Sequence, residues 1–389
     1  MISVSEALHY IVIVSAIYFF IITVINIRFI EYLIDPNKKW IDEPFNDSVS
    51  VLVPARNEED GISDCLRALS IQTYDPIEIL ILDDRSTDRT AEIIKSFADS
   101  DPRIKMISGS EPPEGWLGKH WACDQLFQEA NGDLLLFMDA DTILSERTVA
   151  ASVHESNIRK ADLLTVMPQR IATCITERLM FPFLDWIVFS GMPMAYAHRS
   201  SNQYLSAAFG QFMLFRREAY KRTGGHAEIR SNPLDDFTLG RIIKKLGLTW
   251  VLYQGTESVQ TLGYKGDIEA FRGISRSVFP AINYRVSVFI LFSVILTSLS
   301  FLPLATLVAS VLLNQQSTEL LVLSTMSLGM IIISWAIVCR KFKHSVLAIL
   351  FYPLSVAVII VLAWHSFITY TFGVADWKNR RILGQKIRL

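Results

Sequence analysis

Two aspartates with one small residue between them, Asp139 and Asp141, directly follow an apolar run at residues 134–138. An apolar run this short, bracketed by acids, predicts a buried strand rather than a helix. Because ligands of open α/β sheets bind beyond the carboxyl ends of the strands, the two carboxylates could converge on one oxygen-seeking cation, Mg²⁺ or Mn²⁺. From this motif alone, the alternative is that Asp141 caps the segment that follows it.

Polar residues also follow the first two strands that the sequence predicts. Pro54, Arg56 and Glu58 come after the first strand, and Asp84 comes after the second. The Arg56 guanidinium could pair with a diphosphate, and Glu58 could hold a ribose or a base. The carboxylate of Asp84 could accept hydrogen bonds from a base N–H group or from ribose hydroxyls. These residues predict a nucleotide site at one edge of the sheet.

No glycine-rich phosphate loop is present, because neither GxGxxG nor GxxxxGK[ST] occurs in the sequence. A bound diphosphate would then need a metal and basic side chains to neutralise it. Lys119, at the start of a predicted helix, is a candidate for that role, and a solvated helix residue is the alternative. Asp235 and Asp236 form a further acidic pair before a helix predicted over 237–245, where both could simply cap that helix.

Strands and helices alternate in the region that holds these motifs. Strands are predicted at 48–53, 77–82, 104–107 and 134–138. Helices are predicted at 57–69, 87–97 and 118–129. Ser86 is the predicted N-cap of the second helix. This alternation implies right-handed crossovers and a mostly parallel, Rossmann-like sheet in an α/β domain.

The composition is that of a membrane protein with little net charge. Hydrophobic residues make up 51% of the 389 residues. The mean hydropathy is +0.31, which is too apolar for an ordinary soluble protein. The net charge of -2 and the pI near 6.4 give no indication of nucleic-acid binding. The four cysteines are far apart, so neither a zinc site nor a disulfide framework is indicated.

The excess of apolar residues lies near the two ends of the chain. Apolar runs occupy residues 7–27, 286–313, 320–336 and 345–375. We therefore expect a membrane anchor and linker at 1–45, an α/β domain at 46–284, and transmembrane helices with a basic tail at 285–389. Basic residues after the first run place the α/β domain on the cytoplasmic side of a cell membrane. They are Arg28, Lys38 and Lys39.

The basic tail conflicts with four full crossings, which would place it outside. Basic residues favour the cytoplasmic side. Giving the charges more weight, we expect the run at 345–375, which is long and contains Pro353, not to cross the membrane fully. The basic residues of the tail are Lys378, Arg380, Arg381, Lys386 and Arg388.

Four motifs occur in a fixed order. They are Pro54-Ala55-Arg56-Asn57-Glu58, Asp83-Asp84-Arg85-Ser86-Thr87-Asp88, Asp139-Ala140-Asp141 and Leu234-Asp235-Asp236-Phe237-Thr238-Leu239-Gly240-Arg241. In this order they resemble the family 2 inverting glycosyltransferases of the GT-A fold. The resemblance implies a nucleotide-sugar donor, taken to be a UDP-sugar, and a divalent metal held by Asp141, with Asp139 on the sugar nucleotide or its water shell. It also implies that Asp236 is the general base, with Asp235 orienting it or capping the helix.

Further segments resemble a membrane-bound subgroup that includes carotenoid-type and hopanoid-associated glycosyltransferases. They are Gly115-Trp116-Leu117-Gly118-Lys119, residues 210–217, Gly224-Gly225-His226, Gly273-Ile274-Ser275-Arg276 and Trp377-Lys378-Asn379-Arg380. This resemblance implies a lipid acceptor at the bilayer. The apolar segment 180–189 could lie in the membrane interface and pass a lipid to the site, or be an ordinary buried helix. We expect His226 to contact a phosphate or the acceptor.

The sequence departs from polysaccharide-synthesising relatives, which carry a Gln- or Arg-x-x-Arg-Trp motif after the acidic pair. The matching position keeps Arg276, a candidate donor-site residue, but has Gly273 and Ser277 where Gln and Trp would stand. This departure argues against a processive polysaccharide synthase. A catalytically inactive membrane scaffold is the alternative from another class of protein, and the complete set of acids argues against it.

Overall fold

The computed structural model describes residues 4–35, 45–313, 317–372, 376–377, 380–381 and 387. Contacts group the chain into two compact units. The sheet unit comprises Ile30–Ile171 and Tyr196–Leu262, and the helical unit comprises Met1–Phe29, Ala172–Ala195 and Gly263–Leu389. The boundaries expected after residues 45 and 284 remain a prediction. When the chain is grouped by contacts, it passes from one unit to the other more often than the two passages that the predicted boundaries imply.

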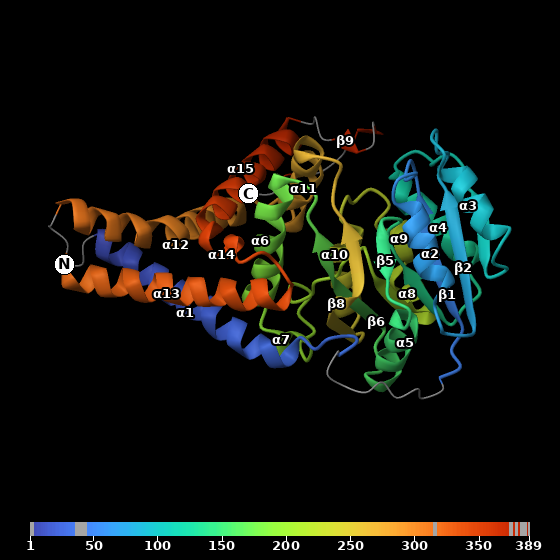
Figure 1. The fold of residues 1–389 in the computed structure, drawn as a ribbon, viewed down its shortest axis with the longest axis horizontal. Coiled ribbons are helices and arrows are strands. Elements are labelled where there is room, and N and C mark those ends of the chain that lie inside the picture. The colour runs from blue at the N-terminus through green and yellow to red at the C-terminus, as the bar shows by residue number, and fades with distance from the viewer. Residues whose placement is uncertain are drawn as a thin grey trace. The chain divides into compact units, whose positions relative to one another are not determined.

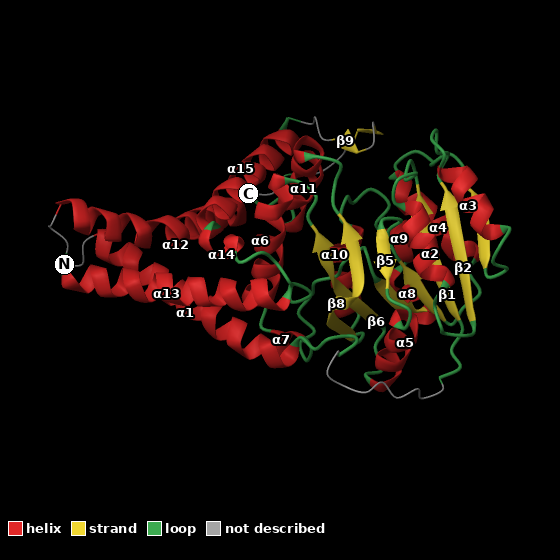
Figure 2. Ribbon diagram, viewed as in Figure 1, coloured by secondary structure: helices red, strands yellow, loops and turns green. Residues whose placement is uncertain are grey.

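The described strands of the sheet unit form one eight-stranded sheet in the order β3-β2-β1-β4-β7-β6-β8-β5 (Figure 2). They are β1 Val49–Ala55, β2 Ile77–Asp83, β3 Ile104–Ser108, β4 Leu134–Phe137, β5 Thr142–Leu144, β6 Leu163–Ile171, β7 Met213–Arg216 and β8 Trp250–Leu262. The neighbours β3, β2, β1 and β4 are parallel. These are the strands that the sequence predicted, and the α/β class is confirmed.

The other half of the sheet is mixed. Strand β7 runs antiparallel to both β4 and β6, β5 runs antiparallel to β8, and β6 and β8 are parallel. An antiparallel β7 starts at the edge of the sheet where β4 ends, because Met213 pairs with Phe137. The segment just before β7 therefore lies beside the predicted acid site.

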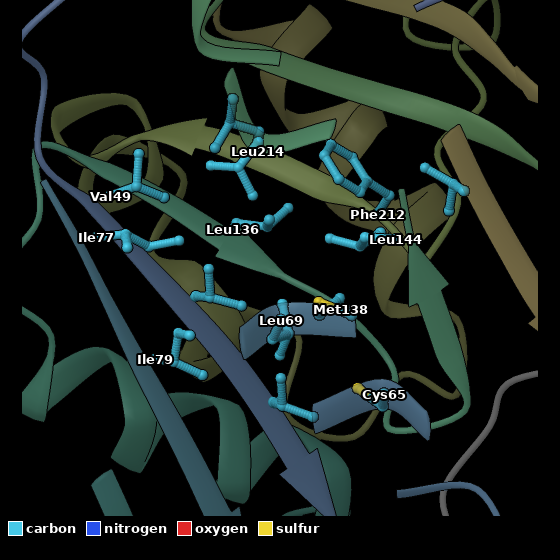
Figure 3. Close-up of a cluster of buried hydrophobic side chains, with 14 of the residues drawn as sticks. Val49, Cys65, Leu69, Ile77, Ile79, Leu136, Met138, Leu144, Phe212 and Leu214 are labelled. Atoms are coloured by element: carbon cyan, nitrogen blue, oxygen red, sulfur yellow. The ribbon is translucent and has the colours of Figure 1, made fainter. Parts of the chain in front are cut away.

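A hydrophobic core between the sheet and helix α2 (Ile62–Ser70) fixes the end of β4. Figure 3 shows Cys65 and Leu69 of α2 among the side chains of Ile79, Leu136 and Met138. All five are at most 1% exposed. Continuous burial of this kind is typical of parallel strands covered on both faces. Since Met138 lies in this core, the backbone just before the Asp139 motif is anchored.

The remaining helices of the sheet unit surround the sheet, and α7 follows the boundary between the units. They are α3 Thr90–Ala98, α4 Gly118–Glu129, α5 Thr148–Ile158, α7 Met194–Ala197, α8 Arg217–Thr223, α9 Gly225–Glu228 and α10 Asp235–Lys245. Helix α4 has the predicted bounds. The predicted start of the first helix at residue 57 is wrong, because Asn57 has a left-handed φ of 52° and α2 begins only at Ile62.

The predicted cap at Ser86 is also wrong. The Ser86 hydroxyl accepts a hydrogen bond from the backbone N–H of Asn57 at 3.0 Å, and α3 begins at Thr90. The Asn57 side-chain oxygen in turn accepts from the backbone N–H of Thr87 at 2.8 Å. These polar side chains join the loops after β1 and β2 to each other, instead of capping helices.

The helical unit contains the apolar ends of the chain. Its helices are α1 Val4–Phe29, α6 Ile175–Gly191, α11 Asp267–Ala281, α12 Val286–Leu313, α13 Thr318–Lys341, α14 Leu347–Leu350 and α15 Tyr352–Thr371. Among the described residues, α1, α12, α13 and α15 are long and apolar enough to cross a membrane. Helices α1, α12 and α13 lie side by side (Figure 1).

The apolar segment predicted at 180–189 forms the centre of α6, inside the helical unit. The Trp186 indole N–H donates to the Ser334 hydroxyl of α13 at 2.9 Å. Asp185, fully buried, lies 2.7 Å from Nε2 of His344. Helix α6 is therefore a buried helix packed among the terminal apolar helices. In the tail, β9 (Asp376–Trp377) pairs with β10 (Arg380–Arg381), and Lys378, Lys386 and Arg388, like Lys38 and Lys39, lie outside the described residues.

Candidate active site

The parallel half of the sheet places three of the predicted motifs next to one another. Ala55 at the end of β1 pairs with Asp83 at the end of β2, and Leu52 of β1 pairs with Phe137 at the end of β4. The segments after these strands leave the same edge of the sheet, since the strands are parallel neighbours. The motif residues thus lie together because of strand order, although they are far apart in the sequence.

Lys119 joins the motif after β4 to the acidic pair that begins α10. Its ammonium nitrogen lies 2.7 Å from a carboxylate oxygen of Asp139 and 3.1 Å from one of Asp235. The side chains of Lys119 and Asp139 are about a quarter exposed, and that of Asp235 is 10% exposed. The solvated helix residue considered for Lys119 is therefore wrong. The predicted contact of Lys119 with a diphosphate remains a prediction.

The ion pairs keep Lys119 and Asp235 charged. Burial alone would lower the pKa of Lys119, but the carboxylates of Asp139 and Asp235 outweigh it and hold that pKa well above its usual value. Burial would likewise raise the pKa of Asp235, yet Lys119 and His226 hold it well below its usual range. Asp235 is therefore an ionised carboxylate at neutral pH.

Asp236 has the opposite protonation behaviour. Its carboxylate accepts hydrogen bonds from the backbone N–H groups of Gly210 at 3.2 Å and Phe237 at 2.7 Å. Burial, with a further contribution from the Asp235 charge, raises the pKa of Asp236 to about 7. Adjacent carboxyls with separated pKa values are the usual arrangement for one fixed charge and one proton-exchanging group.

Gly210, just before β7, lies where these side chains meet. A Cβ atom at this position would lie 3.3 Å from the Lys119 nitrogen, 3.7 Å from a carboxylate oxygen of Asp139 and 3.8 Å from one of Asp236. The close approach leaves little room for a side chain. Sequence reasoning noted this glycine only as part of a motif, and the antiparallel direction of β7 that brings it here was not predicted.

Asp141 lies among other carboxylates. Burial, together with the charges of Asp139 and Glu58, raises the pKa of Asp141 to about 7. The same three carboxylates add to the effect of burial in raising the pKa of the Cys65 thiol, so they surround one region. One carboxylate oxygen of Asp141 is buried without a hydrogen-bond partner. Such a group fits a divalent cation, which would relieve both the repulsion and the missing contact.

The protein alone does not complete a metal shell. Among the residues that the structure describes, no three His, Cys, Asp or Glu side chains gather closely enough to hold a metal ion. A cation at Asp141 would therefore take further ligands from water or phosphate oxygens, as Mg²⁺ commonly does.

The remaining donor-site candidates belong to three different parts of the structure. The Arg56 guanidinium donates to the backbone carbonyl of Asp84 at 2.8 Å and lies 3.4 Å from its carboxylate, so these two residues are paired with each other. Pro54 lines a small recess, defined here by Pro54, Lys119, Asp139, Gly210 and Asp235 among its wall residues. Arg276 belongs to α11 of the helical unit, where its backbone carbonyl accepts from Tyr370 at 2.9 Å.

The histidines near the site are buried. His226 is fully buried and His120 is 2% exposed, which argues against direct contact of His226 with a phosphate or an acceptor. Burial lowers the pKa of His120 to about 3, so it is neutral. The hydroxyl of Tyr220 lies 2.6 Å from Nδ1 of His226. No sequence motif pointed to Tyr220.

Comparison with known proteins identifies the class that this fold and site define. Residues 50–224 match the family model Glycosyl transferase family 2. The solved mannosyltransferase PcManGT of Pyrobaculum calidifontis, in complex with GDP-Man and Mn²⁺, has the same fold, with a TM-score of 0.54, 15% identity and coverage of 94% of this chain and 99% of that one. Residues 50–224 therefore match the family 2 glycosyltransferases, the fold is that of the GT-A enzymes, and the resemblance inferred from the motifs is confirmed.

Curated relatives narrow the similarity further. The chain is 28% identical over 246 residues to 4,4'-diaponeurosporenoate glycosyltransferase of Staphylococcus haemolyticus, covering 62% of this chain and 64% of that protein. It is 28% identical over 229 residues to the protein of the same name from Staphylococcus aureus, covering 58% and 59%. The matched regions span less than two thirds of the length of these relatives.

Proposed function

We propose that this protein is a membrane-bound, metal-assisted inverting glycosyltransferase that moves a sugar from a nucleoside diphosphate donor to a lipid acceptor. The observation that carries the proposal is the divided acidic pair at the start of α10. Asp235 is fixed as an anion by Lys119 at 3.1 Å, and Asp236 beside it has a pKa of about 7. Asp236 lies with Asp139 around Gly210, and Asp235 lines the same recess as Gly210.

Asp236 acts as the general base. A carboxyl with a pKa near neutrality can take a proton at working pH and is still basic enough to assist an acceptor hydroxyl. The acceptor oxygen forms a bond to the anomeric carbon as its proton passes to Asp236. The bond from that carbon to the diphosphate breaks, and the nucleoside diphosphate leaves with the electron pair. A single displacement of this kind inverts the anomeric centre.

The donor is held at the edge where β1, β2 and β4 end. Asp84, Glu58 and Arg56 supply carboxylates and a guanidinium for the nucleotide, and the Arg56–Asp84 pair orients both groups. Asp141, with Asp139 nearby, would hold the divalent cation, which supplies positive charge to the leaving diphosphate. A UDP-sugar remains the predicted donor. PcManGT, which has a similar fold, was solved with GDP-Man and Mn²⁺. This supports a nucleotide sugar and a metal, but it does not identify the nucleobase of the donor.

A lipid acceptor is supported by the chain's apolar helices and by the names of its relatives. The curated relatives are named for glycosyl transfer to 4,4'-diaponeurosporenoate. Four described helices are long and apolar enough for a membrane. We propose a carotenoid-type or similarly apolar acceptor, with the catalytic unit on the cytoplasmic side as the basic residues after α1 predict.

The contacts of α15 support a membrane topology with three crossing helices. Tyr352, at the start of α15, lies against Ser300 in the middle of α12. Further along, Phe367 stacks on Phe289 near the start of α12 at 5.1 Å. Helix α15 therefore runs back along the first half of α12. The two contact points on α12, Phe289 and Ser300, are about 16 Å apart along the helix axis, whereas the hydrocarbon core of a bilayer is about 30 Å thick. Its last turn lies beside Tyr284, which precedes α12.

We propose that the segment from α14 to α15 enters the bilayer and returns to the side it came from. The tail would then lie on the side of the catalytic unit. Labelling with a membrane-impermeant thiol reagent tests this topology. We expect Ile387→Cys to react only from the cytoplasmic side, and Thr318→Cys, at the start of α13, to react from outside. External labelling of Ile387→Cys would overturn the topology.

The experiment for the activity is a donor panel. Membranes with the protein are incubated with UDP- and GDP-sugars and lipid extract, and the products are analysed by mass spectrometry and NMR. We expect a lipid glycoside with an inverted anomeric centre. A long polymer would favour a processive synthase. Absence of turnover, with donor binding unchanged in Asp141→Ala, would favour an inactive scaffold. A retained anomer would contradict the role of Asp236.

A further inference from the structure

A buried chain of polar contacts reaches the acidic pair from the side chain of Tyr220 on α8. The Tyr220 hydroxyl accepts a hydrogen bond from the backbone N–H of His226 at 3.0 Å, and it lies 2.6 Å from Nδ1 of the same histidine. On the other side of the ring, Nε2 lies 3.9 Å from a carboxylate oxygen of Asp235. Tyr220 and His226 are at most 1% exposed.

These contacts fix which ring nitrogen carries the proton. The Tyr220 hydroxyl accepts from the backbone N–H, and among the described residues the acceptor within reach of its own proton is Nδ1 of His226, so we take Tyr220 as the donor to Nδ1. A neutral histidine whose Nδ1 accepts a hydrogen bond carries its proton on Nε2. The Nε2–H group then points its positive end toward Asp235. No other hydrogen-bond partner for this nitrogen occurs among the described residues.

We propose that His226 is a positioning residue for the acidic pair, holding the Asp235 carboxylate ionised and oriented so that Asp236 is the carboxyl that takes the acceptor's proton. The inference rests on the proposed function. At 3.9 Å the contact is a charge–dipole interaction in the free protein, of the kind that tightens when substrate binds. Lys119 acts on the same oxygen of Asp235, so ammonium and imidazole hold it together.

The other groups that face the His226 ring are a neutral histidine, an aspartate and an aromatic ring. His120 of α4 faces it at a ring distance of 5.7 Å and is neutral, because burial lowers the pKa of His120 to about 3. Asp124 of α4 is half-buried, and burial raises its pKa. Phe137, at the end of β4, packs on the ring at 4.9 Å. His120 also favours the ionised form of Asp235, but the imidazole nitrogen that lies 3.9 Å from an Asp235 carboxylate oxygen is Nε2 of His226.

The effect on Asp236 has a definite sign. The positive end of the Nε2–H dipole favours ionisation of both members of the acidic pair. In the absence of this dipole Lys119, at 3.1 Å, still keeps Asp235 ionised, so the pKa of Asp236 rises above about 7, and a base must be ionised to work. The variant His226→Phe should therefore lose activity most at low pH. The midpoint of the acid side of its pH–rate profile should move up by roughly half a pH unit or more.

The test compares kcat, donor KM and pH profile in four proteins. His226→Phe removes the N–H donor and keeps a ring, and His226→Gln returns an amide N–H in the same region. Tyr220→Phe leaves the histidine but removes the hydroxyl that fixes its tautomer. We expect His226→Phe to lose about tenfold in kcat with a small change in KM. We expect His226→Gln to recover most of the rate, and Tyr220→Phe to shift the profile in the same direction by less.

Asp236→Asn in the same assay distinguishes a failure of the proposed function from a failure of the role of His226. If the unmodified protein transfers no sugar, or Asp236→Asn remains fully active, the proposed function fails. If Asp236→Asn is inactive but His226→Phe and Tyr220→Phe both keep the original kcat and pH profile, only the role of His226 is overturned. If His226→Phe does not fold, Tyr220→Phe carries the test, and an unchanged midpoint on the acid side of the pH–rate profile in that variant refutes the inference.

Discussion

Replacing Lys119 by Met should destabilise the sheet unit, because Lys119 neutralises two buried carboxylates at once. Its nitrogen lies 2.7 Å from Asp139 and 3.1 Å from Asp235, and the three side chains are between 10% and 26% exposed. Methionine fills a similar volume but leaves both anions unpaired. Removing one partner of a buried ion pair typically costs about 3–5 kcal/mol, which corresponds to a fall in Tm of about 6–20 °C for a domain of 150–250 residues.

The loss should depend on pH, with a definite sign. Without Lys119, the largest effect that opposes burial at Asp235 is lost, and the folded-state pKa of Asp235 rises above its unfolded value of about 3.9. A carboxyl whose folded pKa is raised destabilises the fold at high pH, and the penalty fades as that carboxyl takes up a proton. The difference in Tm between the variant and the unmodified protein should therefore be larger at pH 8 than at pH 5.

A matched control is available on the surface. Lys221 makes an ion pair of similar length with Glu218, 2.8 Å, but the side chains are 50% and 78% exposed. Lys221→Met should change stability by less than about 1 kcal/mol at either pH. Thermal unfolding of the detergent-solubilised proteins, followed by intrinsic fluorescence, measures both variants. The reasoning is refuted if Lys119→Met costs no more than Lys221→Met, or if its loss is greater at pH 5 than at pH 8.

Three further predictions concern the site itself. Asp236→Asn should lower kcat by roughly 10²–10⁴-fold in a transfer assay. The rate of the unmodified protein should rise with pH through about 7, since the base works only when ionised, and a flat pH–rate profile between pH 6 and 8 would contradict this. Asp141→Asn should weaken activation by Mn²⁺ at least tenfold in a metal titration, and a chelator should abolish transfer by the unmodified protein. Gly210→Ala should lower kcat about tenfold with little change in Tm, because its Cβ would lie 3.3 Å from the Lys119 nitrogen, and normal kcat would show that the lysine can move aside.

The parallel half of the sheet could be predicted from the sequence because its signals are local. Strands β1, β2 and β4 are short, largely apolar runs that lead into Pro or acid, and α4 begins and ends at the predicted residues. The position of Asp139 and Asp141 at a strand end follows from the same pattern. The loops were predicted less well: Asn57 and Ser86 are typical capping residues, but here they bond to each other across neighbouring loops.

What the sequence did not reveal depends on long-range contacts. Lys119 precedes Asp235 by more than a hundred positions, and no spacing rule relates them. The tautomer of His226 depends on the hydroxyl of Tyr220, which only the folded chain brings within 2.6 Å. The apolar segment 180–189 has the composition of either an interfacial or a core helix. Its contact with α13 shows that it packs as a buried helix.

Helix α6 has a consequence for any attempt to study the catalytic part alone. In sequence it follows β6 and precedes β7, yet its side chains pack with the terminal apolar helices. A fragment limited to residues 46–284 would keep α6 and lose α1, α12, α13 and α15. Trp186, which is 1% exposed in the whole chain, would then face water, as would the rest of that apolar surface. Such a fragment should aggregate, whereas shortening α6 or redesigning its apolar face would be the way to a soluble enzyme.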